Sequence, residues 1–263
     1  MTGKLPRLLT FAPMIDSELS RLVLRHHRVA YEERDHLFAW VSLLTLFHGG
    51  YGRVPLLYGK RVRLTGPRPI AEHYDAAARE ERKLIPLREP LARGVELDWV
   101  RYNGRLAFDT AAITYFHLLP ACALMTPIFA APLPRTEARL LPGVYGPTRT
   151  LFKLLLRLNP AHVGNALARV RIAFDRTDER LADGRPYLAG DRLTLSDLSL
   201  ISAAAPLLLP DGYGARLPPL EQMPSPLGAI IVELRRHPTA DFVQRVYRVV
   251  TGGSAEARSS LQT

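Results

Sequence analysis

The residues with the clearest potential for chemistry in this sequence could hold a carboxylate group. The backbone N–H groups of Thr65 and Gly66 lie just before a predicted helix, whose N-terminus attracts anions without the help of a side chain. Arg68 follows in that helix and Arg53 lies upstream, and the guanidinium group of either can pair with a carboxylate. The alternative is that Gly66 and Pro67 form only a tight turn at the start of the helix.

Aromatic residues recur along a predicted helix over 91–118 and indicate a second kind of site. Pockets for apolar ligands are lined mostly by such side chains, together with a few polar groups. The same pattern is typical of a buried core, so a core and a pocket both remain open. The candidate substrate-binding residues are Tyr102, Phe108, Tyr115 and Phe116.

These candidates must be positioned by the strands and helices around them. In the first 75 residues, short apolar runs predict strands, and apolar residues three or four positions apart predict helices. The resulting order, βαβ followed by ββα, is that of a thioredoxin-like fold. The predicted strands are 5–11, 29–32, 54–57 and 62–64; the predicted helices are 17–27, 37–47 (helix or irregular segment) and one that starts at 68.

The rest of the chain predicts a second, all-helical domain. A charged segment interrupted by prolines indicates a linker at 79–92, between domains at 1–78 and 93–250. Residues 251–263 are small and polar, which favours a disordered tail. The predicted helices are 91–118, 147–158, 161–181, 194–208, 226–237 and 240–249.

Two motifs link both predicted domains to one family. The first is Val-Pro-Leu-Leu at 54–57, a strand that opens with a proline. The second is Tyr-Leu-Ala-Gly-Asp at 187–191, followed by Thr194 and Asp197, which form a capping box at the start of a helix. Together the motifs resemble those of the glutathione S-transferase family, over roughly residues 5–250.

The resemblance implies a glutathione site on the thioredoxin-like domain. The peptide bond before Pro55 is expected to be cis, and the backbone of Val54 is expected to pair with the cysteinyl part of glutathione. The positions of the family's thiolate donors align with Thr10 and Met14. A methionine cannot donate a hydrogen bond, so the candidate donors are Thr10 and Ser17, which lies at the second position of a CxxC-like spacing. The alternative for Thr10 is a residue at the end of a strand, and the alternative for Ser17 is the N-cap of a helix. The other candidate glutathione contacts are Trp40, Arg53, Thr65, Gly66 and Arg68.

Charge and cysteine content limit the remaining function classes. The net charge of +10 is spread along the chain without a basic run, so nucleic acid is not expected as a partner. The single cysteine, Cys122, is expected to be buried, and no HExxH or paired CxxC spacing indicates a metal site. Prolines divide the apolar stretch 110–134 into a helix end and a loop, so membrane contact is not expected. The N-terminus shows no secretory signal, which favours a cytoplasmic protein.

We therefore predict a glutathione transferase-like protein that binds glutathione at the Val54–Pro55 edge and conjugates it to a small apolar electrophile. The resemblance also implies a homodimer. Two alternatives remain open: a non-catalytic protein of the same fold that binds or carries an apolar compound, and an assembly module associated with protein or RNA.

Overall fold

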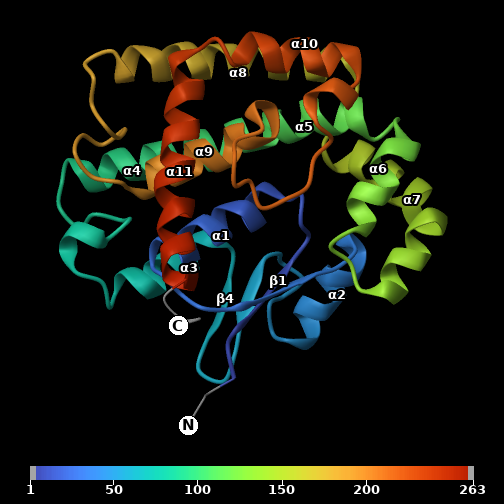
Figure 1. Cartoon of the computed structure of the whole chain (residues 1–263), viewed down its shortest axis with the longest axis horizontal. Helices are drawn as coiled ribbons and strands as arrows, with labels where there is room; N and C mark the ends of the chain where they lie inside the picture. Colours follow the sequence, from blue (N-terminus) through green and yellow to red (C-terminus); the bar gives the residue numbers. More distant parts are fainter. Residues whose placement is uncertain (1–3, 260–263) are drawn as a thin grey trace.

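A computed structural model describes residues 4–259, with side chains up to residue 252. The first part of the chain forms a four-stranded sheet with three helices, and the remainder is helical (Figure 1). The predicted βαβ–ββα order is confirmed. Its elements are β1 (Arg7–Thr10), α1 (Ile15–His26), β2 (Glu32–Asp35), α2 (Phe38–Phe47), β3 (Leu56–Tyr58), β4 (Arg63–Thr65) and α3 (Pro67–Asp75).

The sheet has the strand order β2-β1-β3-β4, in which β1 and β2 are parallel and the other pairs are antiparallel. The predicted position of the second strand, 29–32, is wrong, because pairing with β1 sets Arg7 opposite Glu32 and Thr10 opposite Asp35. The sequence of β2, Glu-Glu-Arg-Asp, has no apolar residue, so hydrophobic patterning could not identify it as a strand.

The second part of the chain is all-helical, as predicted. Its elements are the short η1 (Glu80–Arg82), α4 (Leu91–Trp99), the π-helical η2 (Val100–Leu106), α5 (Ala107–Leu118), α6 (Cys122–Ala130), α7 (Arg135–Leu155), α8 (Pro160–Leu181), α9 (Leu195–Leu208), the short η3 (Leu220–Gln222), α10 (Ser225–Leu234) and α11 (Pro238–Ser259).

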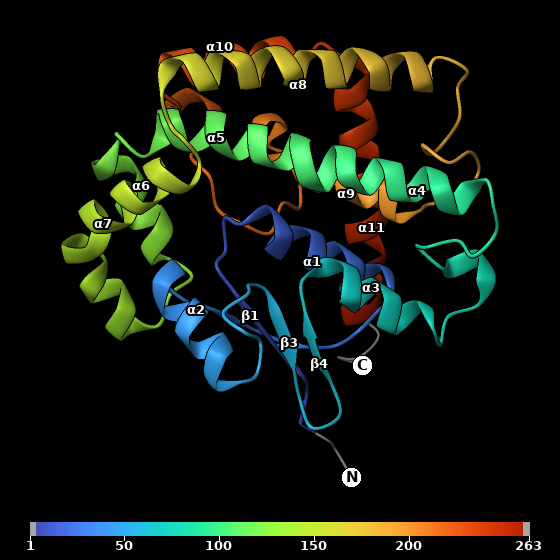
Figure 2. The same cartoon turned by 180° about the vertical axis from the view of Figure 1, so that it is seen from behind.

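Helix α1 lies between the two parts of the molecule, with the sheet on one side and the helical part on the other (Figure 2). It packs against α3 of its own domain and against α9 and α11 of the helical domain. Helix α9 is buried along its whole length. One continuous apolar cluster joins both domains, so they share a single core.

Two expectations about the apolar stretch 110–134 are wrong. Residues expected to form a loop form the helix α6, and Cys122 at its start is exposed rather than buried. Helix α7 then begins well before the predicted position 147 and contains two prolines, Pro142 and Pro147. A proline removes one backbone donor from a helix, but here the buried side chains of Leu141 and Tyr145 anchor the segment in the core.

The C-terminal helix α11 continues to Ser259, into the segment that the sequence predicted to be disordered. The rest of that segment, 260–263, lies outside the described residues. Within the described part of the chain, no single helix is long and apolar enough to cross a membrane. The helices over 91–118 and 122–130 reach that length only together, and they are bent by 120°.

Candidate functional site

A cavity of about 380 Å³ lies between the sheet and the helical domain. One side is formed by the loop between β1 and α1 and by the start of α2. The other side is formed by η2 and by helices α5, α6 and α7, together with the loop after α9. Most of the lining is apolar. The aromatic residues in it are Phe11, Phe38, Phe108, Tyr115, Phe129, Phe152 and Tyr213.

Phe152 of α7 is the centre of an aromatic cluster in this wall. Its ring stacks on Tyr115 of α5, with centroids 4.9 Å apart. It also contacts Phe38 at 5.0 Å and Phe11 at 5.8 Å, both from the thioredoxin-like domain. Aromatic pairs of this kind add to the free energy of apolar burial, so the cluster joins the domains while it shapes the cavity.

Three polar side chains lie among the apolar ones. Asp16, in the first turn of α1, lies opposite Asn103 of η2, and Thr114 projects from α5. Burial raises the pKa of Asp16 to about 6, although a hydrogen bond from Asn103 opposes the shift. Asn103 Oδ1 and Thr114 Oγ1 are buried without a hydrogen-bond partner among the described residues. These atoms are therefore available to a polar group on a ligand.

Two tyrosine hydroxyls complete the polar groups of the cavity. Burial raises the pKa of Tyr115 and of Tyr213 above that of an ordinary tyrosine. Both side chains line the cavity, and both are protonated at neutral pH.

The four candidate substrate-binding residues lie in three different places. Phe108 and Tyr115 line the cavity. Tyr102 is buried in the core instead, with its hydroxyl 3.4 Å from Thr177 Oγ1. Phe116 lies on the side of α5 that faces a separate hollow next to Lys153. The spacing along one helix could not separate these cases, because the core and the cavity lie on adjacent sides of it.

The peptide bond between Val54 and Pro55 is cis, as expected. Gly66 N–H donates to the carbonyl of Pro55 at 2.9 Å, which fixes the start of α3 against this edge. No hydrogen bond joins the backbone of Val54 to another residue in the described ranges. Because Leu56 pairs with Leu9, Val54 lies at the same end of the sheet as the loop that lines the cavity.

The two candidate thiolate donors do not face the cavity. Thr10 is buried, and its hydroxyl lies within hydrogen-bonding distance of Glu33 and Asp35 on the neighbouring strand. Ser17 is buried inside α1, and its Oγ has no partner in the described part of the chain. It is not an N-cap either, because α1 begins at Ile15 with Met14 as its N-cap.

Arg68 and Arg53, the two arginines predicted to contact glutathione, lie in different surroundings. Arg68 forms ion pairs with Glu72 and with Glu96 of α4, and its guanidinium lies 5.7 Å from the ring centroid of Trp99. It therefore joins the two domains, and each of its three nitrogens already donates to a carboxylate. Arg53 is exposed and follows the turn after α2.

The remaining candidate glutathione contacts lie near the sheet edge or on α2. Thr65 ends β4, and Gly66 adopts a φ of 85° before α3. Trp40 lies on α2 with half of its surface exposed. Sequence reasoning missed Asp16 and the cavity residues of α6 and α7, because nothing in the local pattern shows that these distant segments meet.

Asp175, Asp178 and His237 have a spacing that could hold a metal ion. However, Asp178 already accepts hydrogen bonds from Thr239 N–H at 2.7 Å and from the Thr239 hydroxyl at 2.6 Å. His237 Nδ1 lies 2.7 Å from the same carboxylate. The cluster is accounted for by the cap of α11.

No protein-family model and no curated protein sequence matches this chain. Solved structures are nevertheless similar over nearly the whole length. A glutathione S-transferase from Sinorhizobium meliloti has a TM-score of 0.56 and 16% identity, covering 94% of this chain and 93% of that one. A beta-etherase from Sphingobium has a TM-score of 0.55 and 16% identity, covering 90% and 98%. A glutathione S-transferase bound to lactoylglutathione has a TM-score of 0.53 and 17% identity, covering 92% and 99%.

At these identities the similarity concerns the backbone. It extends over nearly the whole of the compared chains. The order of strands and helices in this chain agrees with the order predicted from the sequence. The chain has the fold of the glutathione S-transferases.

Proposed function

We propose that this protein is glutathione transferase-like: it binds a small apolar compound between its domains and glutathione at the neighbouring edge beside Val54. The main support for the proposal is the cavity, because its volume of about 380 Å³ and its mostly apolar lining suit a small organic ligand. The cytoplasmic location, which the N-terminal sequence favours, stays a prediction. The homodimer, which the family resemblance implies, stays a prediction as well.

Two features of the first domain support the glutathione position. The backbone N–H and C=O groups of Val54 have no partner among the described residues and offer an edge to which an extended peptide can add. The N-terminus of α1, where Met14 and Ile15 line the cavity, attracts a negatively charged sulfur. In addition, one of the similar structures holds lactoylglutathione, a glutathione derivative.

In the proposed reaction, the glutathione sulfur forms a bond to an electrophilic carbon of the apolar compound. The thiol proton passes to solvent. The attacked carbon either expels a leaving group with its bonding electrons, or belongs to a double bond whose electron pair then takes up a proton. The protonated hydroxyls of Tyr115 and Tyr213 can donate to the negative charge that develops on the compound.

A non-catalytic carrier of apolar compounds is the second candidate. It is favoured by the placement of Thr10 and Ser17 away from the cavity and by the carboxyl group of Asp16 at the start of α1. When ionised, that carboxyl group repels a thiolate at the same helix terminus.

Calorimetric titration with glutathione, together with thiolate absorbance across pH, separates the two candidates. A transferase binds glutathione and lowers the pKa of its thiol by a unit or more from about 8.5. A carrier binds an apolar fluorescent dye but not millimolar glutathione. Binding of neither ligand would contradict both candidates.

Filling the cavity should weaken binding of the apolar compound. Ala111 of α5 lines the cavity, so the variant Ala111→Trp places an indole in the space that the ligand needs. We expect the dissociation constant of an apolar dye to rise about tenfold or more. The matched variant Ala168→Trp, on an exposed position of α8, should leave it unchanged. Equal dye affinity in both variants would place the dye site elsewhere.

Binding of a neutral apolar compound should depend on pH through Asp16. The carboxyl group is neutral below its pKa of about 6, and a ligand that covers it disfavours the charged form further. Affinity should therefore fall as pH rises from about 5 to 8, by about tenfold for each unit by which the ligand raises that pKa. Asp16→Asn should give a flat profile, whereas Asp183→Asn at an exposed site should keep the wild-type profile.

A further inference from the structure

Large exposed apolar residues lie on α2, on the turn after it and on α7. We call this group the α2–α7 surface and define it by Trp40, Leu43, Phe47, Tyr51, Leu140 and Leu154. Phe47 and Tyr51 are more than four-fifths exposed, at 84% and 85%, and Leu154 is 72% exposed. Single exposed apolar residues are ordinary, but a group of large ones on two adjacent elements indicates an interaction site.

The apolar residues form stripes at helical spacing. Trp40, Leu43 and Phe47 lie three and four positions apart on α2, so they share one face. The buried residues of α2 are Val41 and Thr45, on the opposite side. The helix therefore exposes an apolar face, whereas a helix on a protein surface usually exposes a polar one.

The two helices of this surface are held together. Glu137 of α7 is buried and accepts a hydrogen bond from Leu37 N–H at 2.8 Å, and His36 Nδ1 lies 2.6 Å from the same carboxylate. Leu37 directly precedes α2. Both views show α2 and α7 beside each other at the same end of the molecule (Figures 1 and 2).

The segments that carry the α2–α7 surface are almost free of acidic residues. From His36 to Ala71 the sequence contains no acidic residue, and from Thr110 to Phe174 it contains only Glu137. That carboxylate is buried and engaged with His36 and Leu37. Exposed cations accompany the apolar residues, including Arg53, Arg139 and Lys153.

The cavity reaches this surface. Phe38 of α2 and Leu155 of α7 line the cavity, and Leu155 is also half exposed next to Leu154. Leu155 therefore connects the wall of the cavity to the α2–α7 surface.

We propose that the α2–α7 surface docks on an anionic lipid bilayer. Exposed leucines and phenylalanine would enter the outer part of the apolar layer, and Trp40 and Tyr51 would lie at the level of the headgroups. The surrounding cations match the negative charge of anionic lipids. A second copy of the chain fits less well, because symmetric contact would bring these cations together.

Sedimentation with vesicles tests this docking on the full chain without any ligand. We expect little binding to phosphatidylcholine vesicles and clear, salt-sensitive binding when about one third of the lipid is phosphatidylglycerol. Phe47→Ser with Leu154→Ser should reduce binding about tenfold or more. Leu97→Ser with Val249→Ser, which changes exposed apolar residues outside the surface, should not. Arg139→Gln with Lys153→Gln should remove most of the preference for anionic lipid.

Thermal unfolding checks that each variant is folded, and analytical ultracentrifugation reports self-association. No binding of the wild type to anionic vesicles overturns the proposal. Equal loss in the surface variant and in the control pair also overturns it, because binding would then not depend on this surface. A wild-type dimer that the Phe47 and Leu154 changes dissociate, without vesicle binding, would assign the surface to a second copy instead.

Discussion

Replacing Arg21 by methionine is expected to lower the free energy of unfolding by about 3–5 kcal/mol, because it leaves a buried carboxylate without its cation. Arg21 and Glu18 face each other on α1 with almost no exposed surface. Arg21 Nη1 donates to Glu18 Oε2 at 3.0 Å, and its Nε donates to Glu33 on β2 at 2.7 Å. Its Nη2 also lies 3.7 Å from Asp35 Oδ1, so removal of the arginine affects three carboxylates.

The same carboxylate also joins the domains. Glu18 accepts hydrogen bonds from the hydroxyl of Tyr247 on α11 at 3.1 Å and from Gly214 N–H, in the loop after α9, at 3.0 Å. Both partners belong to the helical domain. We therefore expect Arg21→Met to shift the unfolding of both domains together, with one transition observed by circular dichroism and by tryptophan fluorescence.

Two further variants show whether the loss comes from the unpaired charge. Arg171 pairs with Glu233 at the surface, so Arg171→Met should cost about 1 kcal/mol or less. Glu18→Gln combined with Arg21→Met removes both charges of the buried pair and should recover part of the stability lost in the single variant. A loss below about 1 kcal/mol in Arg21→Met would contradict the network.

The sequence predicted the fold well because the fold depends on local signals. The proline before β3 and the capping box of Thr194 and Asp197 are short motifs whose physical roles are fixed by neighbouring residues. Helix periodicity located most of the helical domain for the same reason. The failures arose where packing outweighs local preference, as in the charged strand β2 and the proline-containing helix α7.

The candidate site could be predicted only in part, because its residues come from segments far apart in the chain. Phe108 and Tyr115 were found from an aromatic pattern on a single helix. Asp16 and Phe152 had no such pattern. Thr10 illustrates the opposite case, because its hydroxyl suggested a role at the site. The carboxylates that occupy this hydroxyl belong to the adjacent strand β2, which was predicted at 29–32 instead of its observed position.

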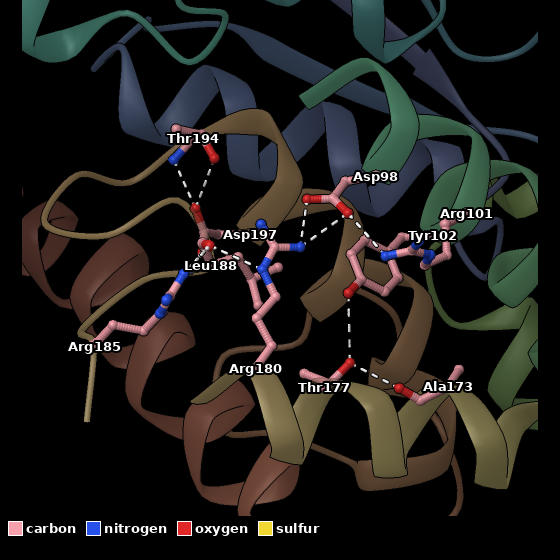
Figure 3. A network of polar contacts seen from close by, with 10 residues as sticks. All are labelled: Asp98, Arg101, Tyr102, Ala173, Thr177, Arg180, Arg185, Leu188, Thr194 and Asp197. Atoms are coloured by element: carbon pink, nitrogen blue, oxygen red, sulfur yellow. Dashed lines mark hydrogen bonds and ion pairs between the residues drawn. The ribbon is translucent and has the colours of Figure 1, made fainter. Parts of the chain in front are cut away.

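Asp197 is expected to be a highly sensitive position in the helical domain. Its carboxylate is fully buried at the start of α9, where Oδ1 accepts from Leu188 N–H at 2.7 Å (Figure 3). Oδ2 accepts from the backbone N–H of Thr194 at 2.7 Å and from its hydroxyl at 2.9 Å. The backbone carbonyl of Leu188 in turn accepts from Arg180 at 2.9 Å, and Arg180 pairs with Asp98 of α4.

Asp197→Ala leaves three donors without an acceptor in the core, so we expect the free energy of unfolding to fall by about 3–5 kcal/mol in chemical denaturation. Asp197→Asn keeps one acceptor for Leu188 but turns an amide donor towards Thr194, which should give an intermediate loss. Thr194→Val removes a single hydroxyl and should cost about 1 kcal/mol. This graded order follows from the number of unpaired donors. If Thr194→Val were as harmful as Asp197→Ala, packing at the start of α9 would be the cause instead of these hydrogen bonds.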